Sequence, residues 1–287
     1  MKYYIKLARP HHWIKNILVL LPLLCSGLLH EWQRLSHGLW AFLAFSMMAS
    51  AIYCLNDVRD RERDRQSTVK CHRPIASGAV SVTGGLVFGS VLFLLALVFA
   101  YLAAETRWSC YLAIAAYFVL NLGYSMGLKK VPLVDIFILA AGFVLRMLFG
   151  GAVTGIEPSS WLCLTVMAVS FYLGLGKRRN ERRGQKGDTR AVLKYYSESF
   201  LDRNMYLCLA LAVMFYAMWT VDAATVARVG SDALVWTVPL VLLICMKYSL
   251  TIDGESDGDP VEVLLHDKVL LLLCLVLAAA VGAILYI

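Results

Sequence analysis

Charged residues are scarce in this sequence. Only 16% of its 287 residues are Asp, Glu, Lys or Arg, while 60% are hydrophobic, and the mean hydropathy is positive. Soluble domains carry about 25% charged residues, so this composition excludes a soluble globular protein. We expect an all-α polytopic membrane protein with one integral-membrane domain over residues 1–287.

Several common catalytic signatures are also absent. The eight cysteines are scattered singly, with no CxxC pair and no His/Cys cluster of zinc-site spacing. There is no GxGxxG, Walker loop, HExxH or Ser/His/Asp signature. These absences argue against a structural zinc site, a dinucleotide or P-loop enzyme and a serine hydrolase. The net charge of +7 comes from basic residues in short loops between apolar segments, so no nucleic-acid partner is expected.

Nine apolar stretches are long enough to cross a bilayer, which takes about 20 residues in a helix. They are residues 14–30, 36–55, 81–104, 108–126, 133–153, 159–176, 203–222, 233–252 and 268–287. If the N-terminus is cytoplasmic, only Arg34, Arg107 and Arg228 of the 27 basic residues fall on the opposite side, and Arg146 lies within a span. Cytoplasmic loops carry the excess of Lys and Arg. We therefore expect a membrane protein with a cytoplasmic N-terminus, a cytoplasm-facing active-site cavity and its C-terminus on the other side.

A dense group of acids follows the second predicted span. Asp57, Asp60 and Asp64 are spaced i, i+3 and i+7, and Asn56 precedes Asp60 by four residues. On a continuous helix, these four oxygen-bearing side chains share one face. Mg²⁺ is usually held by a few carboxylates together with phosphate oxygens of a substrate. The pattern predicts a Mg²⁺ site made of Asn56, Asp57, Asp60 and Asp64.

The alternative for this segment is a solvated, self-paired charged turn at the membrane surface. Four arginines alternate with the acids and could neutralise them: Arg59, Arg61, Arg63 and Arg65. The position between two membrane spans favours the metal site.

Other polar residues on the predicted cytoplasmic side are candidates for binding phosphate. Lys15 and Asn16 lie at the headgroup level of the N-terminal tail, Lys70 and Arg73 follow the acidic motif, and Lys129 follows the fourth span. The tail and Lys129 have an ordinary alternative as cytoplasmic anchors of their spans.

Asp135 and Arg146 lie inside the fifth predicted span, where a charge costs several kcal/mol unless it is paired or faces a polar cavity. They are eleven residues apart, so they project from one helix face about 16 Å apart along the axis. Both a functional site and a structural interhelical ion pair are compatible with this position.

The sixth predicted span runs directly into Lys177, Arg178 and Arg179. Arginine grips phosphate in bidentate fashion, which favours a bound phosphate here, whereas lipid headgroups or solvent would explain the basic residues further along. The acidic motif follows the second span of the first set of four, and this basic segment follows the second span of the second set of four. The cytoplasmic loops 56–80 and 177–203 are thus predicted to carry the motifs and to face a common cavity.

These motifs resemble the UbiA superfamily of intramembrane prenyltransferases. Asn56-Asp57-x-x-Asp60-x-x-x-Asp64 is similar to its first motif. One branch, the decaprenyl-phosphate phosphoribosyltransferases, resembles the chain in further segments: Arg9-Pro10-His11-His12-Trp13-Ile14-Lys15-Asn16, Tyr124-Ser125-x-x-Leu128-Lys129 with Asp135, Gly142-Phe143-x-Leu145-Arg146, Gly176-Lys177-Arg178-Arg179-x-Glu181 and Pro260-x-Glu262-x-Leu264-Leu265-x-Asp267.

The resemblance implies a UbiA-type helical bundle that forms one catalytic domain over residues 1–287 in a bacterial inner membrane, and a Mg²⁺-dependent reaction. Phosphoribosyl diphosphate (PRPP) would give its 5-phosphoribosyl group to a membrane polyprenyl phosphate such as decaprenyl phosphate, releasing diphosphate. The catalytic residues would be Asp57, Asp60, Asp64 and Asp135, with Asp64 or Asp135 stabilising the positive charge on the ribose. The substrate-binding residues would be Lys15 and Asn16 for the lipid phosphate, Lys70, Arg73 and Lys129 for the diphosphate, Lys177, Arg178 and Arg179 for the sugar 5-phosphate, and also Tyr124 and Arg146. A homo-oligomer is compatible with the sequence.

One departure from the superfamily bears on the substrate. Typical members carry a second aspartate-rich motif after span six, where this chain has Lys177-Arg178-Arg179. That difference argues against the nearest rival, a UbiA-type enzyme attaching a prenyl chain to an aromatic acceptor. A transporter of organic anions is a rival of another class, but transporters usually bind near the bilayer midplane, and most of the charge here lies at one face.

Overall fold

The computed structural model describes residues 1–67, 70–105, 107–184, 191–254 and 258–287. Every regular element within these ranges is a helix, so the all-α prediction is confirmed. Eight helical segments in the described ranges are long and apolar enough to cross a membrane: Trp32–Arg59, Val82–Ala104, Trp108–Met126, Val134–Thr154, Ser160–Arg183, Glu198–Val221, Ala233–Asp253 and Lys268–Tyr286. They correspond to eight of the nine predicted spans.

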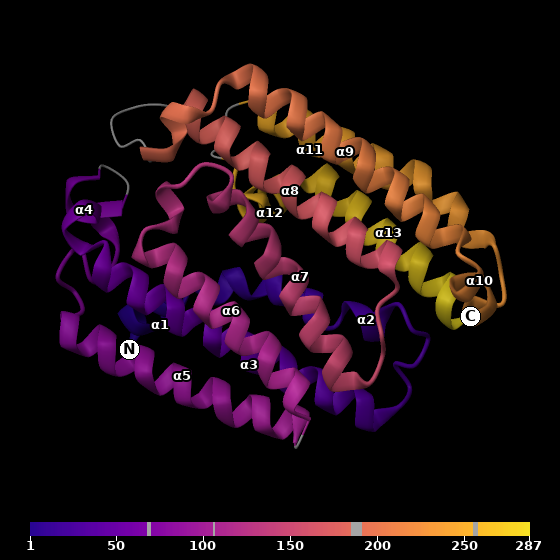
Figure 1. The fold of residues 1–287 in the computed structure, drawn as a ribbon, viewed down its shortest axis with the longest axis horizontal. Coiled ribbons are helices and arrows are strands. Elements are labelled where there is room, and N and C mark those ends of the chain that lie inside the picture. The colour runs from indigo at the N-terminus through magenta and orange to yellow at the C-terminus, as the bar shows by residue number, and fades with distance from the viewer. Residues whose placement is uncertain (68–69, 106, 185–190, 255–257) are drawn as a thin grey trace. The chain divides into compact units, whose positions relative to one another are not determined.

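The chain divides into two compact units (Figure 1). Unit 1 comprises Met1–Leu23, Glu31–Lys129 and Leu145–Ile156, and unit 2 comprises Leu24–His30, Lys130–Val144 and Glu157–Ile287. Helix α7 (Val134–Thr154) contributes its first half to unit 2 and its second half to unit 1.

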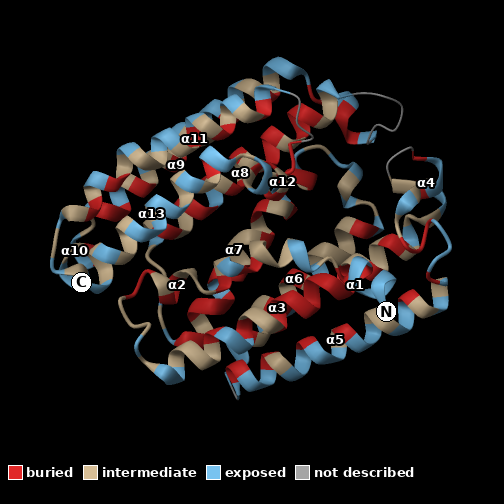
Figure 2. Cartoon of the chain, turned by 180° about the vertical axis from the view of Figure 1, so that it is seen from behind, coloured by how far each residue is buried: buried red, intermediate tan, exposed pale blue. Residues whose placement is uncertain are grey.

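Unit 1 is built around α3. The elements that belong wholly to this unit are α1 (Lys2–Ala8), the 3-10 helix η1 (Pro10–Val19), α3 (Trp32–Arg59), α4 (Arg61–Gln66), η2 (Lys70–His72), α5 (Val82–Ala104) and α6 (Trp108–Met126). The 3-10 helix η3 (Leu128–Lys130) belongs to it up to Lys129. Helix α3 buries small and large apolar side chains on several faces, among them Ala41, Ala44, Phe45 and Met48 (Figure 2). It is therefore a central helix rather than a lipid-facing one.

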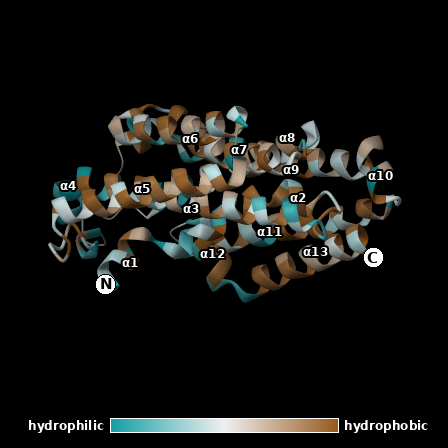
Figure 3. Ribbon diagram, turned by 90° about the horizontal axis from the view of Figure 1, so that it is seen from below, coloured by the Kyte–Doolittle hydropathy of each residue, from teal (hydrophilic) through white to brown (hydrophobic). Residues whose placement is uncertain are grey.

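Helix α5 lies close along α3 because its inner face carries glycine. A Cβ atom at Gly89 would lie 3.1 Å from the Cβ atom of Cys54 on α3, so a larger residue would push the helices apart. Other faces of α5 expose apolar side chains such as Leu94 (60% exposed), and the helix is hydrophobic along most of its length (Figure 3). Such a surface on a long apolar helix suits contact with lipid.

The first predicted span, 14–30, is not a long α-helix, and this prediction needs correction. Residues 10–24 form η1 followed by the single turn α2 (Leu21–Leu24). Proline at position 22 lacks the N–H that a continuing helix uses. Trp13 Nε1 donates to Ser50 Oγ (3.0 Å) and Asn16 Nδ2 donates to Ser46 Oγ (3.1 Å), so polar side chains of α3 bind this irregular segment.

This irregular segment nevertheless runs the length of α3. Arg9 contacts Asp57 at one end, and Leu20 and Leu23 face Gly38 at the other. The 19 residue steps from Gly38 to Asp57 rise about 29 Å along the helix, close to the roughly 30 Å of a bilayer core. Irregular backbone at membrane depth is tolerated where protein covers it. Here a Cβ atom at Gly150 of α7 would lie only 1.7 Å from the carbonyl oxygen of Val19, so glycine allows the two backbones to touch.

The end of unit 1 remote from Asp57 has the features of a membrane interface. Trp32 and Trp108 begin α3 and α6 and are 74% and 76% exposed, as is common for tryptophan at headgroup level. At this end Arg34 Nη1 donates to the carbonyl of Thr154 (2.7 Å) and Arg107 Nη1 to that of Val153 (2.8 Å). Both arginines thus cap the last turn of α7.

Unit 2 is a second helical bundle. Its elements after α7 are α8 (Ser160–Arg183), η4 (Ala191–Tyr195), α9 (Glu198–Val221), α10 (Ala223–Val229), η5 (Ala233–Thr237), α11 (Val238–Asp253), α12 (Pro260–His266) and α13 (Lys268–Tyr286). Tyr172, Leu201, Met205, Tyr248 and Ile252 are buried in its core. Helix α8 continues beyond the predicted end of span six, so Lys177, Arg178 and Arg179 are helical residues rather than loop residues.

Candidate active site

The acidic motif does not lie on one continuous helix, contrary to the prediction. Helix α3 ends at Arg59, Asp60 is its C-cap with φ −88° and ψ 7°, and α4 starts at Arg61. The amide of Asp64 still donates to the carbonyl of Asp60 (2.8 Å). The chain therefore bends at Asp60, and the acids turn to different partners.

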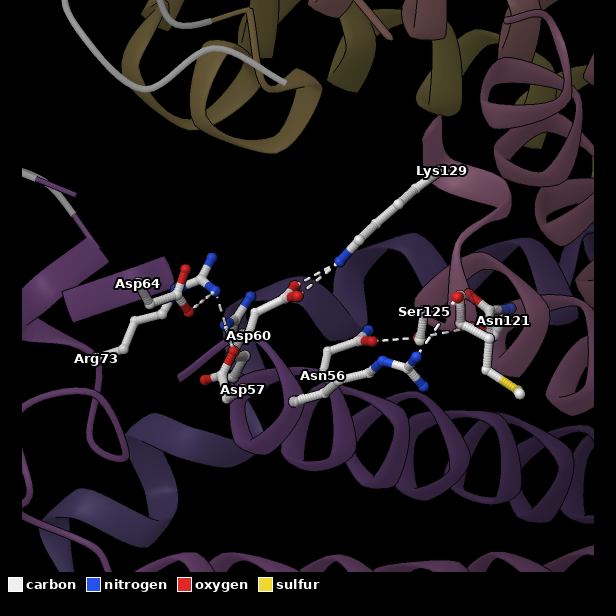
Figure 4. Close-up of polar contacts among 11 residues, drawn as sticks. Asn56, Asp57, Asp60, Asp64, Arg73, Asn121, Ser125 and Lys129 are labelled. Carbon is white, nitrogen blue, oxygen red and sulfur yellow. Dashed lines mark hydrogen bonds and ion pairs between the residues drawn. The ribbon is translucent and has the colours of Figure 1, made fainter. Parts of the chain in front are cut away.

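Asp57 and Asp64 share one guanidinium group (Figure 4). Arg73 Nη1 lies 3.1 Å from Asp57 Oδ1 and 2.7 Å from Asp64 Oδ2. Arg9 Nη2 also donates to Asp57 Oδ1, at 2.6 Å. Asp57 is only 2% exposed, so two cations balance a carboxylate that has lost nearly all its water.

Asp60 points away from this pair and toward Lys129 (Figure 4). Lys129 Nζ lies 2.8 Å from Asp60 Oδ1 and 2.6 Å from Oδ2. Asn56 Oδ1 accepts a hydrogen bond from the hydroxyl of Ser125 on α6, and that hydroxyl also contacts the carbonyl of Asn121. The four motif residues are thus near one another in unit 1: Asp57 and Asp64 share Arg73, whereas Asp60 and Asn56 have other partners.

The cluster fits a hard divalent cation by chemistry but is not a preformed cage. Among the described residues, no group of three or more His, Cys, Asp or Glu side chains is arranged to hold one metal ion. The donors are nevertheless carboxylate and amide oxygens, which Mg²⁺ prefers. In addition, Asp57 Oδ2 is buried and has no hydrogen-bond partner within the described ranges. A buried oxygen of this kind is a candidate metal ligand.

Burial raises the pKa of Asp64 above its ordinary value, while the neighbouring Arg73 and Lys70 oppose this shift. The carboxylate of Asp64 thus depends on nearby positive charge to stay ionised. Lys70 itself is partly exposed, as are Lys15 and Tyr124.

Asn16 and Arg146 are brought together inside unit 1. Arg146 Nε donates to Asn16 Oδ1 (2.7 Å) and its Nη2 to the hydroxyl of Tyr117 (2.9 Å). The guanidinium also lies over the rings of Phe45 and Tyr117. Asn16 is 1% exposed and Arg146 6%, and these contacts favour a role in holding η1 in place. A direct substrate contact for either residue stays a prediction.

Asp135 and Arg146 share α7 but belong to separate networks. Arg178 Nε lies 2.7 Å from Asp135 Oδ2, and the hydroxyl of Tyr196 donates to Asp135 Oδ1 (2.6 Å). Asp135 and Arg178 are both 0% exposed. Of the two interpretations considered for Asp135, the structure favours the interhelical ion pair, and a catalytic role for it stays a prediction.

The rest of the basic segment is also engaged by carboxylates of unit 2. Arg179 pairs with Asp202 on α9 and Asp253 on α11. Lys177 Nζ lies 2.5 Å from Asp259, the N-cap of α12. The ion pairs of these three basic residues therefore connect α8 to α7, α9, α11 and α12. The sequence pattern does not predict these pairs.

Two further residues of the sites were missing from the predicted set. Arg9 belongs to the N-terminal segment that resembles the family but is not among the predicted site residues, yet it binds Asp57 from 48 residues away. Tyr196 was not considered; its hydroxyl accepts from the amide of Leu133 (2.6 Å) while donating to Asp135. Neither the spacing nor the hydropathy around Tyr196 signals this role.

Comparison with known proteins defines the class of this protein. Residues 19–269 match the UbiA prenyltransferase family, and the chain belongs to that family. Its relatives include the decaprenyl-phosphate phosphoribosyltransferase of Corynebacterium glutamicum, 36% identical over 94% of this chain and 83% of that protein. The enzyme of the same name from Mycobacterium tuberculosis is 32% identical over 97% of this chain and 93% of that protein.

A solved structure confirms the fold. A UbiA homolog from Archaeoglobus fulgidus, bound to GPP and Mg²⁺, superposes with a TM-score of 0.73 over 99% of both chains at 19% identity. The chain is thus an integral membrane protein with the UbiA-type helical fold.

Proposed function

We propose that this protein transfers the 5-phosphoribosyl group of PRPP to a membrane polyprenyl phosphate such as decaprenyl phosphate and releases diphosphate. The observation that carries the proposal is the nearly full-length similarity, at 32–36% identity, to proteins named decaprenyl-phosphate phosphoribosyltransferases. The cluster of acids and cations around Asp57 supports it, because this combination suits a metal-bound diphosphate.

Asn56, Asp57, Asp60 and Asp64 are the residues that would hold Mg²⁺. The bound ion would supply a Lewis acid that neutralises charge on the leaving diphosphate. The buried, unpartnered Oδ2 of Asp57 and the Mg²⁺ in the related archaeal structure support this assignment.

Arg73, Lys129 and Lys70 are proposed to hold the diphosphate. All three lie in unit 1, and the first two already contact the acids of the motif. The acceptor phosphate is an anionic nucleophile, so the reaction needs no dedicated general base. Catalysis then comes from positioning and from fixed positive charge. Asp64 is the candidate in this unit to stabilise positive charge on the ribose.

Lys15 is proposed to orient the lipid phosphate. Asn16, the next residue in η1, is buried among Ser46 and Arg146, so we assign it to positioning η1 rather than to contacting the lipid. Tyr124 on α6 precedes Ser125, which binds the motif residue Asn56, and a substrate contact there is part of the proposal.

Of the basic residues on α8, Lys177 is the best candidate for the sugar 5-phosphate. Its side chain is 27% exposed, against 0% for Arg178 and 4% for Arg179. A phosphate would therefore reach the ammonium group of Lys177 far more easily than the two buried guanidinium groups.

We propose that the acidic cluster and the N-terminus face the cytoplasm and that the C-terminus lies on the other side. The distribution of Lys and Arg supports this orientation. The basic residues expected outside also have structural roles: Arg34, Arg107 and Arg228 each donate to a backbone carbonyl. Those arginines therefore do not weaken the argument from the excess of Lys and Arg on the proposed cytoplasmic side.

The direct test is donor consumption. Purified protein with Mg²⁺ and a polyprenyl phosphate is expected to consume labelled PRPP and release diphosphate. Consumption of a prenyl diphosphate in the presence of an aromatic acceptor, with PRPP untouched, would instead identify a UbiA-type aromatic prenyltransferase. Anion flux in sealed vesicles without turnover would identify a transporter.

A further inference from the structure

The acidic motif is electrically balanced by cations from outside it. Three carboxylates, those of Asp57, Asp60 and Asp64, meet three cationic side chains, those of Arg9, Arg73 and Lys129, at 2.6 to 3.1 Å. These three cations come from the N-terminal tail (Arg9), from the residue after η2 (Arg73) and from η3 (Lys129).

The same oxygens cannot serve these cations and a divalent metal equally well. Asp60 has both oxygens within 2.8 Å of Lys129 Nζ, and Asp64 Oδ2 is 2.7 Å from Arg73. A metal ion binding to those oxygens would lie close to the ammonium and guanidinium groups and would be repelled by them. A diphosphate removes the conflict because its oxygens accept hydrogen bonds from Lys and Arg.

Two of the three cations are suited to changing partners. Arg73 and Lys129 have side chains that are 29% and 16% exposed, and each contacts the acids only through the tip of a long side chain. Arg9 is 19% exposed, so exposure does not set it apart from Lys129, but its guanidinium also lies over the ring of Tyr53. This contact restrains Arg9 beside Asp57, so Arg73 and Lys129 are the better candidates for exchange.

We propose that Arg73 and Lys129 are exchangeable counter-ions that make metal and diphosphate binding cooperative. Without ligand they occupy the motif carboxylates and weaken binding of a divalent cation. When diphosphate is present they transfer to its oxygens, and the carboxylates become free for the metal. By linkage, each ligand then raises the affinity for the other by the same factor. This inference rests on the proposed metal role of the motif, but not on which group the diphosphate carries.

The test measures binding without turnover. Mn²⁺ is titrated into purified protein, and free Mn²⁺ is read by electron paramagnetic resonance. Lys129→Gln and Arg73→Gln are expected to bind Mn²⁺ alone several-fold more tightly than the wild type, because the competing charge is gone. Lys130→Gln, a change of the exposed neighbouring lysine, serves as the matched control and should leave the affinity unchanged. Arg73→Lys keeps the charge and should stay close to the wild type, which separates loss of charge from loss of fold.

A second measurement tests the cooperativity. Retention of labelled inorganic diphosphate by the wild type should rise about fivefold or more when Mn²⁺ is added, and this gain should shrink in Lys129→Gln and Arg73→Gln. The proposal is overturned if the two glutamine variants bind Mn²⁺ alone as weakly as the wild type or more weakly, or if Mn²⁺ leaves diphosphate retention unchanged. Because no ribosyl donor is used, this result and PRPP consumption can fail independently.

Discussion

A substitution of Arg178 distinguishes a structural role of this residue from a substrate-binding role. Its guanidinium and the carboxylate of Asp135 are both 0% exposed and 2.7 Å apart. Removing one partner of such a pair leaves a buried charge without compensation, which costs about 3–5 kcal/mol. At about 2–4 °C per kcal/mol for a chain of this size, Arg178→Ala should lower the Tm by about 10 °C.

The assay is thermal unfolding of the detergent-solubilised protein, with each variant compared under identical conditions. Arg183→Ala is the matched control, since Arg183 lies on the same helix but is 39% exposed in its ion pairs, and such pairs contribute about 0–1 kcal/mol. Replacing both partners, as Asp135→Leu with Arg178→Met, should recover most of the lost stability because no buried charge remains.

The opposite outcome would refute the structural reasoning. If Arg178 is a free ligand for the sugar 5-phosphate, Arg178→Ala should keep the Tm of the control variant and raise the KM for the donor instead. A normal Tm together with a donor KM raised tenfold or more would show that the ion pair with Asp135 contributes little.

Three further predictions concern other charges. Asp60→Asn should abolish turnover while the Tm stays near the wild-type value. The control is Glu62→Gln, which changes an exposed acid of the same segment and should keep near-normal rates. Substantial activity in Asp60→Asn would contradict the metal role. Lys177→Ala should raise the KM for the donor much more than that for the acceptor, and equal effects on both would remove the 5-phosphate assignment. Hydrogen bonding to Lys247, to Thr251 and to a backbone amide lowers the pKa of Asp267, so its contribution to stability is present above about pH 4, the unfolded value, and is lost as the pH falls further. The Tm difference between wild type and Asp267→Asn should therefore be largest near pH 7 and shrink below pH 4.

Hydropathy is enough to predict the long helices because a helix that crosses lipid must be apolar over a fixed length. A bilayer core demands about 20 apolar residues with internally bonded backbone, and eight of the nine predicted stretches meet it as helices. Residues 14–30 satisfy the same count, yet their backbone is irregular. The reason lies in distant residues, since Ser46, Ser50 and Gly150 provide the hydrogen bonds and the space that this segment needs.

The sequence predicted which acidic residues make up the candidate site, but not which cations pair with them. The spacing of Asp57, Asp60 and Asp64 identified a cluster of oxygen donors, and these residues do lie together in unit 1. The bend at Asp60 was not visible in the spacing, because it depends on the partners that Asp60 and Asp64 find in Lys129 and Arg73. Such contacts over long sequence separations have no local signal.

Burial, rather than residue type, separates the basic residues that can bind substrate from those that hold the fold together. Arg73 and Arg178 are both arginines paired with aspartate at 2.7 Å. Arg73 keeps 29% of its side chain exposed, so a phosphate can reach it from solvent, whereas Arg178 keeps none. The buried carboxylate of Asp64 that Arg73 leaves would need another cation, such as the proposed metal ion, to balance its charge. Releasing Arg178 would strand Asp135 in a protein interior, where an unpaired charge is most costly. The cations that we propose to bind phosphate are accordingly Arg73 and Lys129 beside the acidic motif and Lys177 on α8, and in each case an anion would have to replace an aspartate partner.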